Sequence, residues 1–327
     1  MSPASNKTRV AGEWAAGRQQ GGFSMIEMLI SVAIGLLVTG AVLYTVSTAG
    51  VSGRKQEVQS TMHDLGNLAM VQLGEHLRMS GFSIPASEVA AGDMFELGEK
   101  SVFGCQAGFA PGQGNQPWNW ATQTCEGNRA NSAASDAIAL RFQLQPGGRN
   151  WDCLGNAVID SLTAAGMPNT NGLLVADEIQ ERFYVRTTGT ASGNPGLFCS
   201  SSINPGVEQL VADNVDQMRI HYGVSAINDA AQELNRAFDD PSLIGRTTKY
   251  YRASGMADDC TPGALPDNSW CAVNTVQVCL VMRSNDNVND EANTPYVDCE
   301  GTVRYANDRR LRQAFTMTVA IRNKIER

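Results

Sequence analysis

Residues 22–50 read GFSMIEMLISVAIGLLVTGAVLYTVSTAG, and this stretch decides the fold class and the compartment. No charged residue occurs between Glu27 and Arg54, a run of 26 residues. As a helix the run would be about 39 Å long, at roughly 1.5 Å per residue, which is enough to cross a hydrocarbon core of about 30 Å. The sequence therefore predicts a membrane-spanning helix.

The charges on either side of this run predict its orientation. Residues 1–22 carry three basic side chains against one acidic one, a net charge of +2, and the next charge after the run is Arg54. Because basic residues favour the cytoplasmic side, we expect the N-terminus inside the cell and the rest of the chain exported to the periplasm. A soluble chain with a buried helix is the alternative, which the length of the run makes improbable.

The overall composition narrows the class of protein. The 327 residues include 25 Lys and Arg against 33 Asp and Glu, so the net charge is 25 − 33 = −8. With 18 % charged and 43 % hydrophobic residues, the chain is neither a disordered nor a coiled-coil polymer. Its acidity makes nucleic acid an improbable partner. The 32 Gly and 12 Pro favour a loop-rich body that leans towards β-structure.

The better-formed cleavage junction lies before the apolar run. An ordinary secretory signal is cut after its apolar stretch, where residues 48–50 offer only a poor small-residue site. A short basic leader, Gly22, Phe23, a serine, two apolar residues and Glu27 resemble instead the class III signal of type IV prepilins. The resemblance implies that a prepilin peptidase cuts after Gly22 and N-methylates Phe23, which leaves the helix on the mature chain.

Glu27 is the residue whose chemistry matters most. A carboxylate at the centre of a membrane costs about 2.5–3.5 kcal/mol on insertion scales, and such residues usually have a function. A purely structural alternative is that Glu27 reaches the headgroups and orients the helix. After cleavage, the α-amine of Phe23 would lie four residues away and would stabilise the carboxylate. The prepilin resemblance implies that Glu27 neutralises the N-terminal amine of a neighbouring subunit during assembly.

Beyond the membrane the helix is expected to continue with one apolar face. Apolar residues recur every three or four positions with polar residues between them, which is typical of a helix that packs on a globular body. The apolar positions are Val58, Met62, Leu65, Ala69, Leu73 and Leu77. Gly81 is a plausible C-terminal stop.

The remainder predicts a β-rich head. Alternating apolar positions predict strands at 136–144, 276–282 and 315–321. Further strands are expected at 173–176, 181–187 and 197–199, and a short helix or turn leading into a strand at 210–223. Residues 82–131 are interpreted as loop, and 226–240 as either a helix or an insertion.

The expected fold class is α+β, a long transmembrane and amphipathic helix packed on a disulfide-containing head. Its expected divisions are a removed leader at 1–22, an assembly helix at 23–53, its amphipathic continuation at 54–81 and the head at 82–327.

Four segments resemble the PilW family of type IV pilus minor pilins: 78–82, 210–223, 276–284 and 309–323. The resemblance implies a subunit that moves from the inner membrane into the pilus. There it joins other minor pilins and the major pilin in a tip complex that initiates assembly, in a fibre used for adhesion and twitching motility. A tip adhesin is a further candidate partner.

Two alternatives remain open. One is the J-type minor pseudopilin of type II secretion systems, and the other is a membrane-tethered periplasmic binding or hydrolytic domain. Residues 86–134 and 226–268 match nothing in the family.

All eight cysteines follow the membrane segment, in a space expected to be oxidising, and their even number favours disulfides. Eight cysteines allow 105 pairings. Pairs that are near in sequence are favoured, the first two most: Cys105–Cys125, Cys279–Cys299, Cys153–Cys199 and Cys260–Cys271.

No catalytic or cofactor motif is recognisable. There is no C-x-x-C, the three histidines are far apart, and no phosphate-binding loop occurs, so we expect no metal, no cofactor, no bound nucleotide and no enzymatic activity. Residues 285–291 are rich in oxygen ligands but lack the Gly and distant Glu of a calcium loop, which favours a solvated loop.

Overall fold

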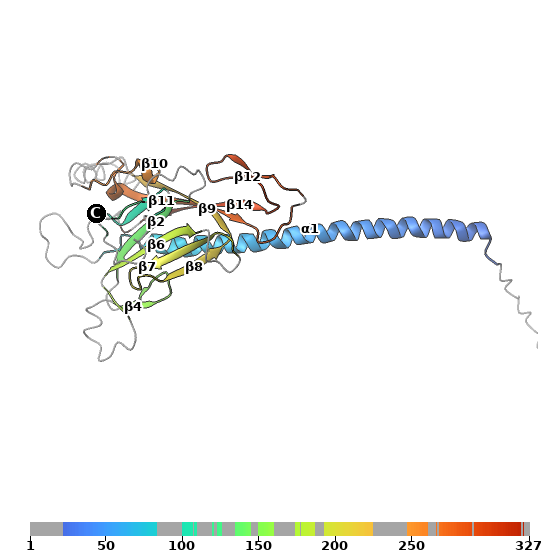
Figure 1. The fold of residues 1–327 in the computed structure, drawn as a ribbon, viewed down its shortest axis with the longest axis horizontal. Coiled ribbons are helices and arrows are strands. Elements are labelled where there is room, and N and C mark those ends of the chain that lie inside the picture. The colour runs from blue at the N-terminus through green and yellow to red at the C-terminus, as the bar shows by residue number, and fades with distance from the viewer. Residues whose placement is uncertain are drawn as a thin grey trace, which may run out of the picture. The chain divides into compact units, whose positions relative to one another are not determined.

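The computed structural model describes residues 22–83, 100–106, 108–109, 120, 123–125, 135–144, 150–159, 174–176, 178–186, 193–224, 247–260, 266, 268–289, 291–321 and 323. The chain divides into two compact units, Met1–Arg54 and Lys55–Arg327. The second unit is called the head below. Among the described residues, it holds all the strands and also the second half of the α-helix (Figure 1).

Helix α1 spans Met25–Met79. Within the head, its residues Met62, Ala69, Leu73 and Leu77 are buried in the main core, whereas Val58 and Leu65 are half-buried. These six positions are the ones that the three- and four-residue spacing predicted to form the packed face of the helix. Burial of one face against the strands stabilises this half of the helix more than intrinsic propensity does.

The end of α1 is set by a glycine. The helix stops at Met79, and Gly81 adopts a left-handed conformation with φ of 77°. This conformation lets the Phe82 N–H donate to the Met79 carbonyl at 3.0 Å, so that a carbonyl of the last turn has a partner. The predicted stop at Gly81 is confirmed.

Two sheets make up most of the head. The larger has the order β1-β2-β6-β7-β8 and is antiparallel throughout. Its strands are β1 Val102–Cys105, β2 Ala137–Gln143, β6 Glu178–Arg186, β7 Gly196–Ser201 and β8 Glu208–Asp213. Strand β2 is buried at six of its seven positions, as expected for an inner strand that is covered on both faces.

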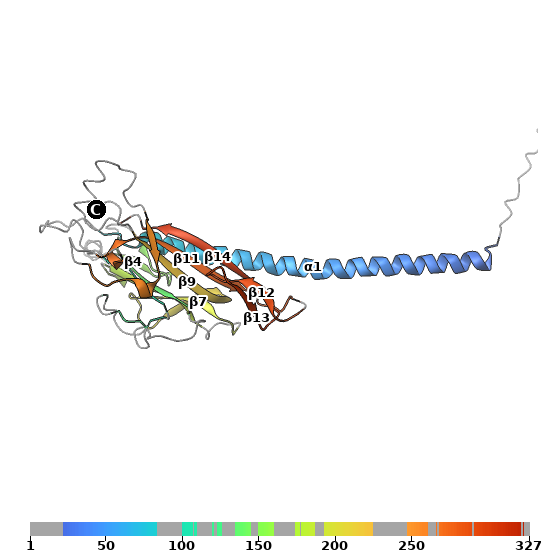
Figure 2. The ribbon, with the colours of Figure 1, turned by 90° about the horizontal axis from the view of Figure 1, so that it is seen from above.

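The second sheet has the order β10-β9-β11-β14, also antiparallel. Figure 2 shows its strands β9, β11 and β14 beside one another. Its strands are β9 Val215–Val224, β10 Lys249–Tyr251, β11 Val273–Arg283 and β14 Arg312–Ala320. Strand β14 pairs with β11 over nine consecutive residues without a register shift, whereas the β11–β9 pairing has two.

Smaller elements complete the described head. They are β3 Asn150–Trp151, β4 Ala157–Ile159 and β5 Leu174–Val175 in one sheet, the hairpin β12 Thr294–Val297 with β13 Val303–Ala306, and the 3-10 turns η3 Ala253–Gly255 and η4 Trp270–Ala272.

One main core joins the helix to both large sheets. It contains the buried face of α1 together with apolar side chains of β1, β2, β6, β7, β9, β11 and β14. Trp270 is buried in it, with its ring 4.7 Å from that of Tyr222 and 5.2 Å from that of Phe103. A smaller cluster holds Phe142, Leu144, Val158 and Ile179.

The expected fold class is confirmed: a long N-terminal helix and a β-rich head with disulfides. The strands expected at 136–144, 276–282 and 315–321 are β2, β11 and β14. The expectation at 210–223 was partly wrong, because β8 and β9 are two strands separated by Asn214, whose φ is 63°.

The loop interpretation of 82–131 was also incomplete, because β1 lies within it. Most of 86–134, all of 226–240 and the leader 1–21 lie outside the described residues.

Candidate functional site

The N-terminal junction lies at the start of α1. Gly22, Phe23 and Ser24 precede the first helical residue, and the Met28 N–H donates to the Ser24 carbonyl at 3.1 Å, which places Ser24 at the helix start. Phe23 is 83 % exposed. Both residues of the expected cleavage site, Gly22 and Phe23, are therefore outside the helix and accessible to another protein.

Glu27 lies in the first turn of α1 and is exposed. It follows Phe23 by four residues, and Phe23 lies just before the first helical residue. A carboxylate in the first turn is favoured by the helix dipole. Because the segment up to Arg54 holds no other charge, Glu27 is the one ionic group on this part of the helix.

The helix around Glu27 presents apolar side chains on all sides. In the part of α1 that forms the first unit, the exposed large apolar residues are Met25, Ile26, Met28, Leu29, Ile30, Val32, Ile34, Leu36, Leu37, Val38, Val42, Leu43, Tyr44 and Val46. Helix α1 is long and apolar enough to cross a membrane. A helix that is apolar all round needs lipid or other helices as its surroundings.

A buried pair links the helix to the larger sheet. His76 Nδ1 lies 2.7 Å from Glu181 Oε2, and the Glu181 side chain is fully buried. The other carboxylate oxygen of Glu181 accepts the Cys153 N–H at 2.7 Å. Burial lowers the pKa of His76, but the contact with Glu181 and its charge outweigh burial and raise that pKa above its ordinary value. The raised pKa favours the protonated form of His76, and the contact holds α1 on β6.

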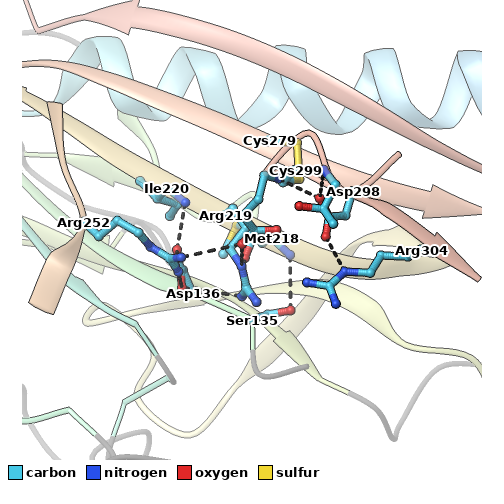
Figure 3. A network of polar contacts seen from close by, with 12 residues as sticks. Ser135, Asp136, Met218, Arg219, Ile220, Arg252, Cys279, Asp298, Cys299 and Arg304 are labelled. Atoms are coloured by element: carbon cyan, nitrogen blue, oxygen red, sulfur yellow. Dashed lines mark hydrogen bonds and ion pairs between the residues drawn. A yellow bond between two sulfur atoms is a disulfide. The ribbon is translucent and has the colours of Figure 1, made fainter. Parts of the chain in front are cut away.

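A second buried network ties the two sheets together (Figure 3). The Asp136 carboxylate, just before β2, accepts the Ile220 N–H of β9 at 2.9 Å and two bonds from Arg252 Nη2 at 3.0 and 3.2 Å. Arg219 lies 3.6 Å from the same carboxylate and donates to Glu300 at 2.6 Å. Burial raises the pKa of Asp136 above its usual value, against the lowering effect of the Ile220 N–H and the two arginines.

The charged side chains of this network contact one another, and Asp136 also accepts a backbone N–H. Such mutual pairing is typical of a structural cluster. Sequence reasoning missed it because Asp136 is more than eighty residues from Arg219, Ile220 and Arg252. The only local signal was the Asp136 charge at the start of a strongly apolar strand.

The structure joins the eight cysteines in four disulfides. They are Cys105–Cys125, Cys153–Cys199, Cys260–Cys271 and Cys279–Cys299, the pairs that nearness in sequence favoured, with Cα–Cα distances of 5.3 to 6.3 Å. Cys279 is in β11 and Cys299 is in the turn of the β12–β13 hairpin, so this bond fastens the hairpin to the second sheet. Figure 3 shows it beside Asp298, whose side chain accepts from Arg304 at 2.8 Å.

Within the described ranges, no group of three or more His, Cys, Asp and Glu side chains is arranged to hold a metal ion. Asp286 in the 285–291 loop is exposed, and its carbonyl accepts from the Ser284 hydroxyl at 2.7 Å. Val288 in the same loop is buried, and the N–H groups of Val288 and Asn289 donate to the Arg309 carbonyl at 3.0 and 2.9 Å, so the described part of the loop is only partly exposed.

Comparison with known proteins gives two family matches. Residues 17–43 match the model described as the prokaryotic N-terminal methylation motif, and residues 182–323 match the model described as type IV pilus-assembly protein W. No curated protein matches the chain. Among solved structures, a type IV-like pilin from Thermus thermophilus is similar over 80 % of this chain and 96 % of its own, at 12 % identity and a TM-score of 0.38.

Proposed function

We propose that this chain, a type IV pilin-like protein whose residues 182–323 belong to the PilW family, is a minor pilin that takes part in initiating pilus assembly and forms part of the pilus tip complex. The position of Glu27 carries the proposal. It is the one charge of an otherwise apolar helix segment, and it lies four residues from the residue that cleavage would turn into an N-terminus.

The assembly step follows from this placement. Removal of residues 1–22 by the prepilin peptidase leaves Phe23 with a free α-amine, which is then N-methylated and stays cationic. In the membrane, the Glu27 carboxylate and this amine are costly unless each has a partner of opposite charge. Docking of Glu27 against the Phe23 amine of a neighbouring subunit pairs the charges and fixes the axial register of the two helices.

The partners and location follow from the same mechanism. The mature protein is held in the inner membrane by the apolar half of α1, with the head in the periplasm, until it joins other minor pilins and the major pilin. Four disulfides in the head fit an oxidising compartment. A structural role of this kind needs no cofactor and no catalytic group.

Replacement of one carboxylate tests the mechanism. Glu27→Gln keeps the size of the side chain and removes its charge, so we expect the protein to disappear from sheared pili while its membrane level stays normal. Glu57→Gln is the matched control, because Glu57 is an exposed carboxylate of the same helix beyond the apolar run. Wild-type incorporation of the Glu27 variant would overturn the proposed docking.

The processing and the type of fibre are tested separately. Mass spectrometry of the membrane form should give an N-terminus at methylated Phe23. Recovery of the protein only with a type II secretion complex, and never with pili, would favour the pseudopilin alternative. A head activity that is independent of Glu27 would favour the membrane-tethered binding or hydrolytic domain.

A further inference from the structure

The β12–β13 hairpin has one face towards the second sheet and one face towards solvent. On the first face, the Tyr296 ring lies 5.5 Å from the Arg312 guanidinium, and the Asp298 side chain is buried. Because successive residues of a strand point to opposite faces, the odd-numbered residues of the hairpin share the second face. They are Pro295, Val297, Val303 and Tyr305, which pair across the two strands and are all exposed.

This second face is an apolar patch that is held in place. Val297, Val303 and Tyr305 are 53, 54 and 69 % exposed. The Cys279–Cys299 disulfide ties the turn of the hairpin to β11, so the patch keeps its position on the sheet. A contiguous apolar patch of this kind usually marks a contact with another molecule or with lipid.

Strand β14 shows which end of the head lies towards the membrane segment. It runs in the same direction as α1, since Phe315 at its start lies beside His63 and Asn323 just beyond its end donates to the Arg78 carbonyl. The head begins at Lys55, directly after the apolar run. The end of the head where β14 begins is therefore the end at which the chain enters from the apolar run.

The hairpin lies at this same end. Its turn is bonded to β11 opposite Thr316, whereas Tyr296 faces Arg312 at the first position of β14. The open end of the hairpin, which carries Tyr305, therefore points towards the end of the head where β14 begins. Figure 1 shows β12 and β10 towards opposite ends of the head.

The segment after the hairpin adds a positive charge. Arg309 is exposed, whereas the neighbouring Arg310 and Arg312 donate to side chains of the head. Tyrosine is enriched at membrane surfaces, where its ring reaches the acyl chains and its hydroxyl stays with the headgroups. An arginine beside such a patch can pair with lipid phosphate. The hairpin and Arg309 together have the chemistry of a surface that binds phospholipid.

The length of the apolar run favours contact between this end of the head and the bilayer. The run would be about 39 Å long as a helix, whereas the hydrocarbon core is about 30 Å thick, so a helix that keeps the run in lipid has to tilt. Tilting lowers one side of the head towards the bilayer surface. The apolar patch and its arginine select the hairpin side.

We propose that the outer face of the β12–β13 hairpin, together with Arg309, binds the membrane surface and holds the head against phospholipid headgroups until the subunit joins a fibre. The apolar side chains of the patch enter the boundary between headgroups and acyl chains, and Arg309 pairs with phosphate. The inference rests on the membrane anchoring in the proposed function and adds a second lipid contact, which assembly has to release.

Quenching by labelled lipid tests the contact in the full chain. All eight native cysteines are in disulfides, so an added cysteine takes a thiol-reactive fluorophore. Tyr305→Cys labels the hairpin, and Tyr250→Cys in β10, at a tyrosine that is 42 % exposed, is the matched control. In phosphatidylcholine and phosphatidylglycerol nanodiscs, lipid with a quencher near its headgroup should remove most of the Tyr305→Cys fluorescence and little of the Tyr250→Cys fluorescence. One chain per disc excludes a neighbouring subunit as the cause.

A third label separates this inference from the anchoring on which it rests. Val38→Cys lies within the apolar run and should be quenched by lipid that carries its quencher deep in the acyl chains. If Val38→Cys is quenched and Tyr305→Cys is quenched no more than Tyr250→Cys, the anchoring stands and the hairpin contact is wrong. If Val38→Cys is not quenched, the anchoring fails and the hairpin contact fails with it.

Substitutions beside the label test the lipid chemistry. Arg309→Glu should reduce the quenching of Tyr305→Cys most in discs rich in phosphatidylglycerol, whereas Arg309→Lys should preserve it. Val297→Ser with Val303→Ser should reduce quenching in neutral lipid as well, because it removes the apolar part of the patch. Circular dichroism identifies the variants that keep the native fold. Quenching that is unchanged in folded Arg309→Glu and in the folded double variant would overturn the proposal.

Discussion

Replacing Glu181 with glutamine should destabilise the head, and the loss should be largest at mildly acidic pH. The substitution keeps the shape of the side chain and an oxygen that can still accept the Cys153 N–H. It removes the negative charge that lies 2.7 Å from His76 Nδ1. The change therefore isolates the ionic part of the contact between α1 and β6.

The magnitude and its pH dependence follow from burial. The Glu181 side chain is fully buried and that of His76 is 15 % exposed, so breaking the pair with His76 protonated should cost about 3 kcal/mol. The pKa of His76 in the folded protein is raised above 6.5. The stabilisation is therefore fully present below about pH 6.5 and is lost as the pH rises through the raised pKa. Above it, the difference should fall to about 1 kcal/mol or less.

Urea unfolding of the full chain in micelles, with disulfides intact, measures this difference. Trp270 is 2 % exposed in the main core, so its fluorescence reports loss of packing. Series from about pH 5.5 to about pH 8.5 cover the expected change. Glu75→Gln, at an exposed carboxylate of the same helix, should stay within about 0.5 kcal/mol of wild type. A difference between wild type and Glu181→Gln that is constant, or grows with pH, would refute the reasoning.

Three further changes have defined outcomes. Gly66→Ala places a methyl 2.9 Å from the Phe315 ring, so overpacking should lower the free energy of unfolding by about 1–3 kcal/mol, measured in urea. Replacing Cys279 and Cys299 by serine opens a loop with a sequence separation of 20 and should cost about 3 kcal/mol, with faster proteolysis of the β12–β13 hairpin. Asp136→Ala leaves two arginines without their buried carboxylate and should lower the thermal midpoint by the equivalent of about 3–5 kcal/mol.

Long and strongly alternating elements could be predicted from the sequence. Strands β2, β11 and β14 alternate or are apolar over seven or more residues, and the apolar spacing of α1 selected its buried face. The junction at Gly22 and Phe23 and the lone Glu27 could be located because the motif that identifies them is a continuous stretch of sequence. The disulfide pairs could be predicted from nearness in sequence, because the two cysteines of each pair are no more than 46 residues apart.

Short or context-dependent features could not be predicted. Strand β1 has four residues and contains a glycine, so its pattern is indistinguishable from loop until β2 pairs with it. The break between β8 and β9 depends on the positive φ of Asn214. The sequence around Asn214 is equally compatible with a turn or the start of a helix, so it did not reveal this conformation. The contacts of Asp136 and Glu181 join residues that are far apart in sequence, so they depend on the tertiary fold and leave no local sequence pattern.

The contact between α1 and β14 constrains when the head can fold. The ring of Phe315 lies 5.3 Å from that of His63, and the Asn323 side chain donates to the carbonyls of Arg78, Met79 and Ser80. The first and last elements of the head are thus neighbours across more than 240 residues of chain. Because contacts of such long range form late, a nascent polypeptide cannot complete this core until β14 has left the ribosome. Until then the membrane helix would hold an unfinished domain, and a chain cut before Arg312 would leave it unfinished permanently.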